Sequence, residues 1–172
     1  MNFFLKTFFL IFFLCSNVFA TNIAVIKINY IINNVPSYNI FINKLLSDKK
    51  ITEETLQNKE KDLLFEKNEI NESRLILSES EIDKLINIYQ QKVQNFQSEV
   101  LNHNQYFDKN IDHNKNKVLQ EIIKIITLIS DERNYDLVLN ENNYFLASDT
   151  IDLSGEVISL LNDIEISYEL ID

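Results

Sequence analysis

The sequence predicts an α+β protein. A small β-sheet body, made by an N-terminal strand and a C-terminal hairpin, carries a long antiparallel helical-hairpin arm. Three observations predict it. Residues 21–29 form a short apolar run, residues 36–133 have helical periodicity without a glycine, and residues 136–148 form two short apolar runs around a polar turn. A lone hairpin is marginal in water, so we expect the N-terminal strand to pair with it.

The first 20 residues have the pattern of a secretory signal peptide. One basic residue, Lys6, precedes an apolar run from Thr7 to Cys15, and Val18-Phe19-Ala20 resembles a cleavage site. The alternative is an uncleaved anchor, but the run is shorter than the roughly 20 residues of a membrane span. Cleavage after Ala20 removes the only cysteine and leaves no stable membrane insertion, and it moves the formal charge from −10 to −11.

Residues 21–35 are predicted to contribute the first strand of the body. Ile23 and Val25 share one face of a strand, and Ala24, Ile26 and Ile28 share the other. Since both faces are apolar, we expect this strand to be covered on both sides.

Residues 36–133 are predicted to form the arm, with its tip near residues 77–81. Asn34 can cap the first helix and Pro36 suits its first turn, while Ser78 or Ser80 can cap the second. The two helices would span roughly 60 Å and 80 Å at 1.5 Å per residue. The predicted seam between them consists of Leu56, Leu63, Ile70, Leu77, Ile82, Ile86, Tyr89, Val93, Phe96 and Val100.

Beyond Val100 the seam is predicted to become irregular. His103 and Phe107 continue the spacing, and Ile111 and Val118 then require an extra four-residue step, which is a stutter. Polar seam positions such as His103 and Asn114 are expected to weaken a core that is already thin. We therefore expect bending arms rather than rigid rods.

Residues 134–163 are predicted to complete the body with the hairpin and a short helix. Asn134 can adopt the left-handed conformation that ends the second arm helix. Asp152 or Ser154 would cap the last helix, with Val157, Leu160 and Leu161 on its apolar face. The tail, residues 164–172, alternates like a strand and equally extends the helical face, so both readings remain open.

Composition argues against an enzyme and against nucleotide chemistry. Gly155 is the single glycine, whereas phosphate loops and nucleophile elbows need two or more. His103 and His113 would lie about 15 Å apart on one helix, too far to share a metal ion. The negative charge disfavours nucleic acid as a partner. We therefore predict no catalytic, metal or cofactor site.

The order of these elements resembles the Skp/OmpH family of periplasmic chaperones. The likeness is sharpest in "IAVIKINYIINNVPSYN" at 23–39 and "ERNYDLVLNENNYFLASDTIDLSGEVISLLN" at 132–162. It implies an ATP-independent holdase in the periplasm, a homotrimer whose helical arms surround unfolded outer-membrane proteins. Trimerisation through the body would close sheet edges that one chain leaves open. The residues we expect to contribute to it are Ile23, Val25, Ile26, Leu137, Val138, Leu139, Phe145, Val157 and Leu161.

The chain departs from that family in charge. Well-known members are basic, whereas residues 60–95 here carry five basic and eight acidic side chains. We therefore assign no lipopolysaccharide site and no particular client-binding face. The rival prediction is an exported coiled-coil adaptor that binds one folded envelope partner.

Overall fold

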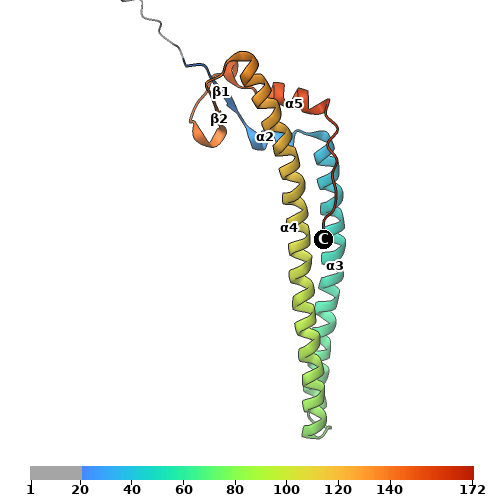
Figure 1. The fold of residues 1–172 in the computed structure, drawn as a ribbon. Coiled ribbons are helices and arrows are strands. Elements are labelled where there is room, and N and C mark those ends of the chain that lie inside the picture. The colour runs from blue at the N-terminus through green and yellow to red at the C-terminus, as the bar shows by residue number, and fades with distance from the viewer. Residues whose placement is uncertain (1–20) are drawn as a thin grey trace, which may run out of the picture.

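The fold combines a small body with one long helical arm. The computed structural model describes residues 21–172, so the predicted signal peptide and its cleavage site lie outside the described residues. Figure 1 shows α3 (Pro36–Ser73) and α4 (Glu79–Arg133) side by side, projecting from a body that contains β1, β2, α2 and α5. The predicted α+β class, with long helical arms and a small sheet, is confirmed.

The sheet of the body joins the start of the described chain to the segment that follows α4. Strand β1 (Ile23–Ile26) pairs in parallel with β2 (Leu137–Asn140), with Ile23 opposite Leu137 and Ile26 opposite Asn140. Asn22 extends the pairing, because the Asp136 N–H donates to its carbonyl at 2.8 Å and its own N–H donates to the Asp136 carboxylate at 2.7 Å. Parallel strands need a crossover connection, and here the arm provides it.

The prediction of a C-terminal hairpin is wrong. The second run, Tyr144–Leu146, is not a strand in the described chain, and a short 3-10 helix, η1 (Glu141–Asn143), follows β2 directly. The Asn140 side chain accepts the Glu141 N–H at 2.8 Å and starts that turn. The free edge of β1 is taken instead by the segment around Asp152, and the Leu153 N–H donates to the Val25 carbonyl at 2.9 Å.

The first strand is shorter than predicted. It ends at Ile26, and α2 (Ile28–Asn33), a short helix that the sequence did not suggest, follows it. The first amides of α2 are satisfied by distant side chains: Asn140 Oδ1 accepts from the Ile28 N–H and Glu141 Oε1 from the Asn29 N–H. Ile31 and Ile32 of α2 are buried, so the helix adds an apolar face to the body.

The arm begins and ends at local signals, most of which the sequence predicts. Pro36 is in the first turn of α3, although Val35 rather than Asn34 precedes that helix. Ser78 caps α4, and its N–H and hydroxyl both donate to the Glu81 carboxylate, at 3.0 and 2.6 Å. Asn134 ends α4 with φ 53°, in the left-handed region. The connection between the helices is residues 74–78.

The core lies where the arm meets the body. Helix α5 (Ser154–Asn162) packs there with β1, α2 and the last turns of α4, and η2 (Asp149–Ile151) precedes it. Of the two predicted capping residues, Asp152 is the one whose side chain bonds to the start of α5: its Oδ1 accepts the Ser154 N–H at 2.9 Å. The buried side chains of this core are Ala24, Ile26, Ile31, Ile32, Val35, Tyr38, Val118, Ile122, Ile125, Ile129, Leu153, Val157 and Leu161.

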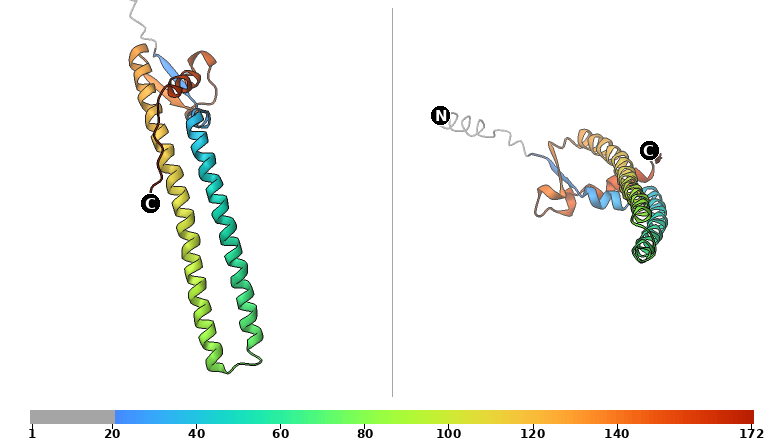
Figure 2. Two further views of the ribbon diagram at one scale, coloured as in Figure 1. Left: turned by 90° about the vertical axis from the view of Figure 1, so that its right-hand side faces the viewer. Right: turned by 90° about the horizontal axis from the view of Figure 1, so that it is seen from below.

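The tail is neither of the two elements that its pattern allowed. Residues 163–172 form no helix and no sheet ladder, and they run in a largely extended conformation back along α4, away from the body (Figure 2). The tail therefore pairs with side chains of the arm rather than with a sheet.

Candidate functional site

The distal part of the arm has a loosely closed seam. Of the ten predicted seam residues, Leu56, Ile70 and Ile82 are buried and Leu77 is 38 % exposed, while the other six are half-buried. Two ion pairs cross the seam, Lys59 with Glu99, and Lys92 Nζ with Glu66 Oε1 at 2.7 Å. Two helices alone thus leave most of the side chains between them partly accessible to water.

Shallow grooves follow the same seam. One, of about 340 Å³, has Leu63 and Phe96 in its floor. A second, of about 560 Å³, is lined in part by His103 and Phe107. His103 is buried edge-on against Phe107, with ring centroids 4.8 Å apart, and its Nε2 has no hydrogen-bond partner within residues 21–172. Its placement fits the seam role that the sequence predicts.

Large apolar side chains stand exposed along both helices of the arm and at its tip. Leu75 and Ile76, at the tip, are almost fully exposed. The other exposed members, from the first turns of α3 through the tip to the middle of α4, are Ile40, Leu46, Ile51, Leu64, Phe65, Leu77, Ile88 and Leu101. Scattered apolar groups are normal on protein surfaces, but a long arm that presents this many of them offers many weak contacts.

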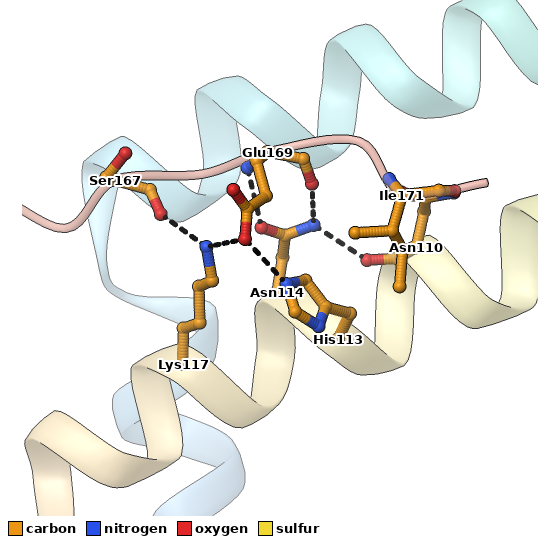
Figure 3. A network of polar contacts seen from close by, with 7 residues as sticks. All are labelled: Asn110, His113, Asn114, Lys117, Ser167, Glu169 and Ile171. Atoms are coloured by element: carbon orange, nitrogen blue, oxygen red, sulfur yellow. Dashed lines mark hydrogen bonds and ion pairs between the residues drawn. The ribbon is translucent and has the colours of Figure 1, made fainter.

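At the base of the arm, two buried asparagines of α4 hold the tail. Asn114 accepts the Glu169 N–H at 3.1 Å and donates to the Glu169 carbonyl at 2.8 Å. Asn110 binds Ile171 in the same way, at 2.7 and 2.9 Å. Both asparagine side chains are completely buried. Asn114, predicted to weaken the seam, is therefore fully satisfied by hydrogen bonds (Figure 3).

A charged group lies beside these amides. Glu169 Oε1 lies 2.8 Å from Lys117 Nζ and 3.1 Å from His113 Nε2 (Figure 3). Lys117 also donates to the Ser167 carbonyl at 3.0 Å. The hydrogen bond from Lys117, followed by that from His113, holds the pKa of the Glu169 carboxyl below its ordinary value of 4.5. Glu169 is therefore ionised at neutral pH and ties the tail to α4.

The other side of the tail contacts α3. The Tyr168 ring stacks on Phe41, with centroids 5.2 Å apart, and lies 6.0 Å from Tyr38. Its hydroxyl is 3.0 Å from Ser37 Oγ. Burial raises the pKa of Tyr168 and of Tyr38 above the ordinary value of 10.0, so both phenols stay neutral and apolar in character. The tail thus bridges the two arm helices where they leave the body.

A polar link also closes the body. Lys27 Nζ and Asp152 Oδ2 are 2.7 Å apart. Burial acts to raise the pKa of Asp152, but the hydrogen bonds from Lys27 and Ser154 outweigh it and hold the value below the ordinary 3.8. The hydrogen bond to Asp152 raises the pKa of Lys27. This pair joins the end of β1 to the start of α5.

A profile described as "Outer membrane protein (OmpH-like)" matches residues 22–161. That span is most of the chain. This chain belongs to the OmpH-like family. Among curated proteins, none matches the sequence at a significant level.

A solved structure supports the OmpH-like fold. It is the structure of a candidate outer membrane chaperone, OmpH-like, from Caulobacter crescentus CB15. The TM-score is 0.63 at 14 % sequence identity, and the match covers 89 % of this chain and 93 % of that one. At so low an identity the likeness concerns the fold, and the matched profile ends before the tail.

The residues that we expected to join OmpH-like protomers separate into two groups. Val25, Ile26, Val157 and Leu161 are buried within the protomer and contribute to its own packing. Leu137 and Phe145 are exposed, and Ile23, Val138 and Leu139 are half-buried. Leu146, which the sequence did not single out, is also exposed beside Phe145. Of these nine residues, only the second group is therefore accessible to a partner.

The described part of this OmpH-like chain offers no obvious metal centre or membrane span. Residues 21–172 contain no cluster of three or more histidine, cysteine, aspartate or glutamate side chains arranged to bind a metal. None of their helices has both the length and the apolar character that crossing a membrane requires.

Sequence reasoning missed the tail site. Asn110 was not singled out, because an asparagine on a helix usually faces solvent. A signal existed in the spacing of the polar residues. One face of α4 carries Asn110, Asn114 and Lys117 at spacings of four and three, and this face continues the apolar seam beyond Phe107. The predicted stutter, which assumed that the seam continues through Ile111, lies at the same position in α4. The buried row continues instead through Asn110 and Asn114 to Val118.

Proposed function

We propose that this protein is an ATP-independent holdase chaperone that shields unfolded outer-membrane proteins between helical arms. The observation that carries the proposal is the distal arm: long, loosely closed and dotted with exposed large apolar side chains. Membership of the OmpH-like family supports it. In this proposal residues 21–35 and 134–163 form the body and residues 36–133 the arm. No enzymatic step and no cofactor is part of it.

Shielding would act through many weak contacts. An unfolded barrel exposes alternating apolar residues and unpaired strand edges, which aggregate. Side chains such as Phe65, Ile76 and Ile88 can each contact such a segment without a fixed register. Several of these contacts on one client multiply in effect, because each raises the local concentration of the next.

The cavity for the client would come from a homotrimer. The edge of β2 that faces away from β1 is unpaired within residues 21–172, and Phe145 and Leu146 are exposed on the loop that follows. Open edges and exposed apolar loops favour association with further copies. Three protomers joined through their bodies would place three arms around one space.

Export to the periplasm completes the proposal. The signal pattern of residues 1–20 predicts cleavage after Ala20. N-terminal sequencing of protein purified from the periplasm should therefore begin at Thr21.

The acidic charge of the arm predicts how client binding should depend on salt. Residues 60–95 carry more acidic than basic side chains, so attraction of acidic clients cannot drive binding. Client retention should therefore depend weakly on salt between low and physiological ionic strength, where an electrostatic capture would fall steeply.

The deciding experiment is light scattering coupled to size exclusion, on the mature protein alone and with a urea-denatured outer-membrane barrel diluted into it. The expected result is a trimer that keeps the barrel soluble in a discrete complex. A monomer, or a trimer that lets the barrel precipitate, contradicts the proposal and favours the adaptor that binds one folded envelope partner.

Two variants separate assembly from client binding. Phe145→Ser with Leu146→Ser should reduce the oligomer. Phe65→Asn with Ile76→Asn should keep the oligomer and lower the capacity to suppress aggregation. Asn68→Ala, at another exposed position of α3, is the matched control and should change neither.

A further inference from the structure

The base of the arm holds an extended chain by its backbone. Asn110 and Asn114 each bind both the N–H and the carbonyl of one tail residue, Ile171 and Glu169. Lys117 continues the row with a bond to the Ser167 carbonyl. None of these three contacts involves a side chain of the tail. They therefore recognise the geometry of its main chain rather than its sequence.

The spacing of this row matches an extended strand. Four residues of helix α4 rise about 6 Å, and two residues of an extended chain advance about 6.6 Å. Asn110 and Asn114 are four apart on the helix, and their partners Ile171 and Glu169 are two apart on the tail. A chain in another conformation would not present both residues to both asparagines at once.

The tail lies in a groove between α3 and α4, lined by Asn110, Asn114 and Lys117 on one side and by Tyr38 and Phe41 on the other. This groove also distinguishes the two faces of the bound chain. Ile166 and Tyr168 pack against the core, and Tyr168 is held by Phe41 and Tyr38. Glu165 and Ser167, between and beside them, are exposed. The apolar side chains that the core accepts from the tail are therefore two positions apart, Ile166 and Tyr168, whereas Leu170 is exposed.

The asparagines are buried polar groups whose partners outside α4 come only from the tail among the described residues. Amides placed on an apolar seam are costly unless they are hydrogen-bonded. Two of them in register, next to the apolar residues Phe107 and Val118 of the same buried row, indicate a site built for a backbone.

We propose that this groove is a binding site for an extended polypeptide with alternating apolar side chains, and that the tail is a built-in competitor that an unfolded client strand displaces. The inference rests on the proposed chaperone function. Transmembrane β-strands alternate apolar and polar residues over about 9–11 positions; residues 164–170 have that alternation, and the whole tail has about that length. A tethered competitor lowers the apparent affinity of the groove for any one free segment.

The first test uses fluorescence anisotropy with a labelled peptide that copies residues 163–172. The full chain is compared with a tail-released variant, Ile166→Asn with Tyr168→Ser, which leaves the groove unchanged. The peptide should bind the tail-released variant at least tenfold tighter than the unaltered chain. A peptide of the same composition with its apolar residues grouped together should bind weakly. Equal binding to both proteins contradicts the proposal.

A groove variant provides the matched comparison. Asn114→Leu, added to the tail-released variant, should abolish peptide binding, whereas Asn116→Leu, at an exposed position of the same helix, should not. Far-UV circular dichroism on each protein checks that the fold persists. Peptide binding that survives Asn114→Leu overturns the assignment of the site.

Hydrogen exchange on the unaltered chain tests displacement without any substitution. The amides of Glu169 and Ile171 should be protected alone and should exchange faster when a urea-denatured outer-membrane barrel is added. If the barrel stays soluble while these amides remain protected, the tail is a structural latch and the chaperone function stands without this site. If the barrel precipitates, the proposed function fails, and the assignment of the client with it.

Discussion

The two halves of helix α4 differ in how many neighbours cover them. Near the body, Val118 and Ile122 are inaccessible to solvent, because α2, α3, α5 and the tail surround them. Towards the tip, Ile86 and Val93 of the same helix have α3 as their partner and remain half-buried. The comparison shows that one continuous helix can be fully covered at one end and only partly covered at the other.

The difference has an energetic basis. Hydrophobic stabilisation scales with the apolar area removed from water, about 25 cal/mol per Å². A seam between two helices removes part of that area, and a core of four or five elements removes nearly all of it. Local opening should therefore cost least near residues 74–78 and most near Ile122.

The strongest way to break this comparison is a cavity at each end. Ile122→Ala should lower the free energy of unfolding by about 2–5 kcal/mol, because a fully buried side chain leaves a cavity. Ile86→Ala should cost clearly less, since its neighbourhood is already partly hydrated. Urea unfolding followed by circular dichroism measures both, and equal losses would remove the distinction.

The hydrogen bonds of the tail should be the next largest contribution to the higher stability of the base of the arm. Asn114→Ala removes two hydrogen bonds to Glu169 and should cost roughly 1–3 kcal/mol in thermal or urea unfolding. Asn116→Ala, two residues further on and exposed, is the control and should be near neutral. A neutral result for Asn114 would mean that the tail does not stabilise the base.

The end of α4 tests the geometry of the base. Asn134 has φ 53°, where a β-branched residue is strained by about 1–2 kcal/mol. Asn134→Val should lower the melting temperature, and Asn134→Gly should keep or raise it. The opposite order would contradict the left-handed conformation.

The tip should respond locally. Ser78→Ala removes the hydroxyl that donates to Glu81 and should cost about 0.5–1 kcal/mol in the first turn of α4. Hydrogen exchange should accelerate around residues 74–85, while protection near Ile122 stays unchanged. Faster exchange along the whole arm would show that the tip and base unfold together.

Acid should loosen the tail before the core. Because the folded-state pKa of Glu169 is below its ordinary 4.5, its contribution is present above pH 4.5 and is lost as the pH falls through the lower, folded value. The effect is small, since Glu169 is exposed. Amide shifts of Glu169 and Ile171, followed by NMR from pH 6 to 3, should report it, and Glu169→Gln should flatten the titration.

Local signals made the arm predictable. Pro36, the Ser78–Glu81 pair and Asn134 act within four residues of themselves, so the sequence shows them directly. The apolar row from Leu56 to Val100 predicts two helices for the same reason. The apolar runs on either side of the arm predicted the small sheet of the α+β class, and the family resemblance agreed with it.

The errors in the body involve partners far away in the sequence. In place of the predicted hairpin, the partners of the sheet are distant: β1 pairs with β2 on one edge and with Asp152 on the other, 127 residues from Val25. Helix α2 forms where Asn140 and Glu141, 112 residues distant, accept its first amides. No pattern within a short window reports such bonds.

The sequence by itself determined the helical arm, the capping residues near its tip and at the end of α4, and the apolar strand that opens the body, because periodicity and capping depend on neighbouring residues. The tertiary structure alone decided the parallel pairing of the strands and the path of the tail. Residues 164–172 have a pattern that suits a strand and a helix equally. Their extended conformation was settled by Asn110 and Asn114, which are 61 and 55 residues away and present a row of amides that only an extended backbone can satisfy.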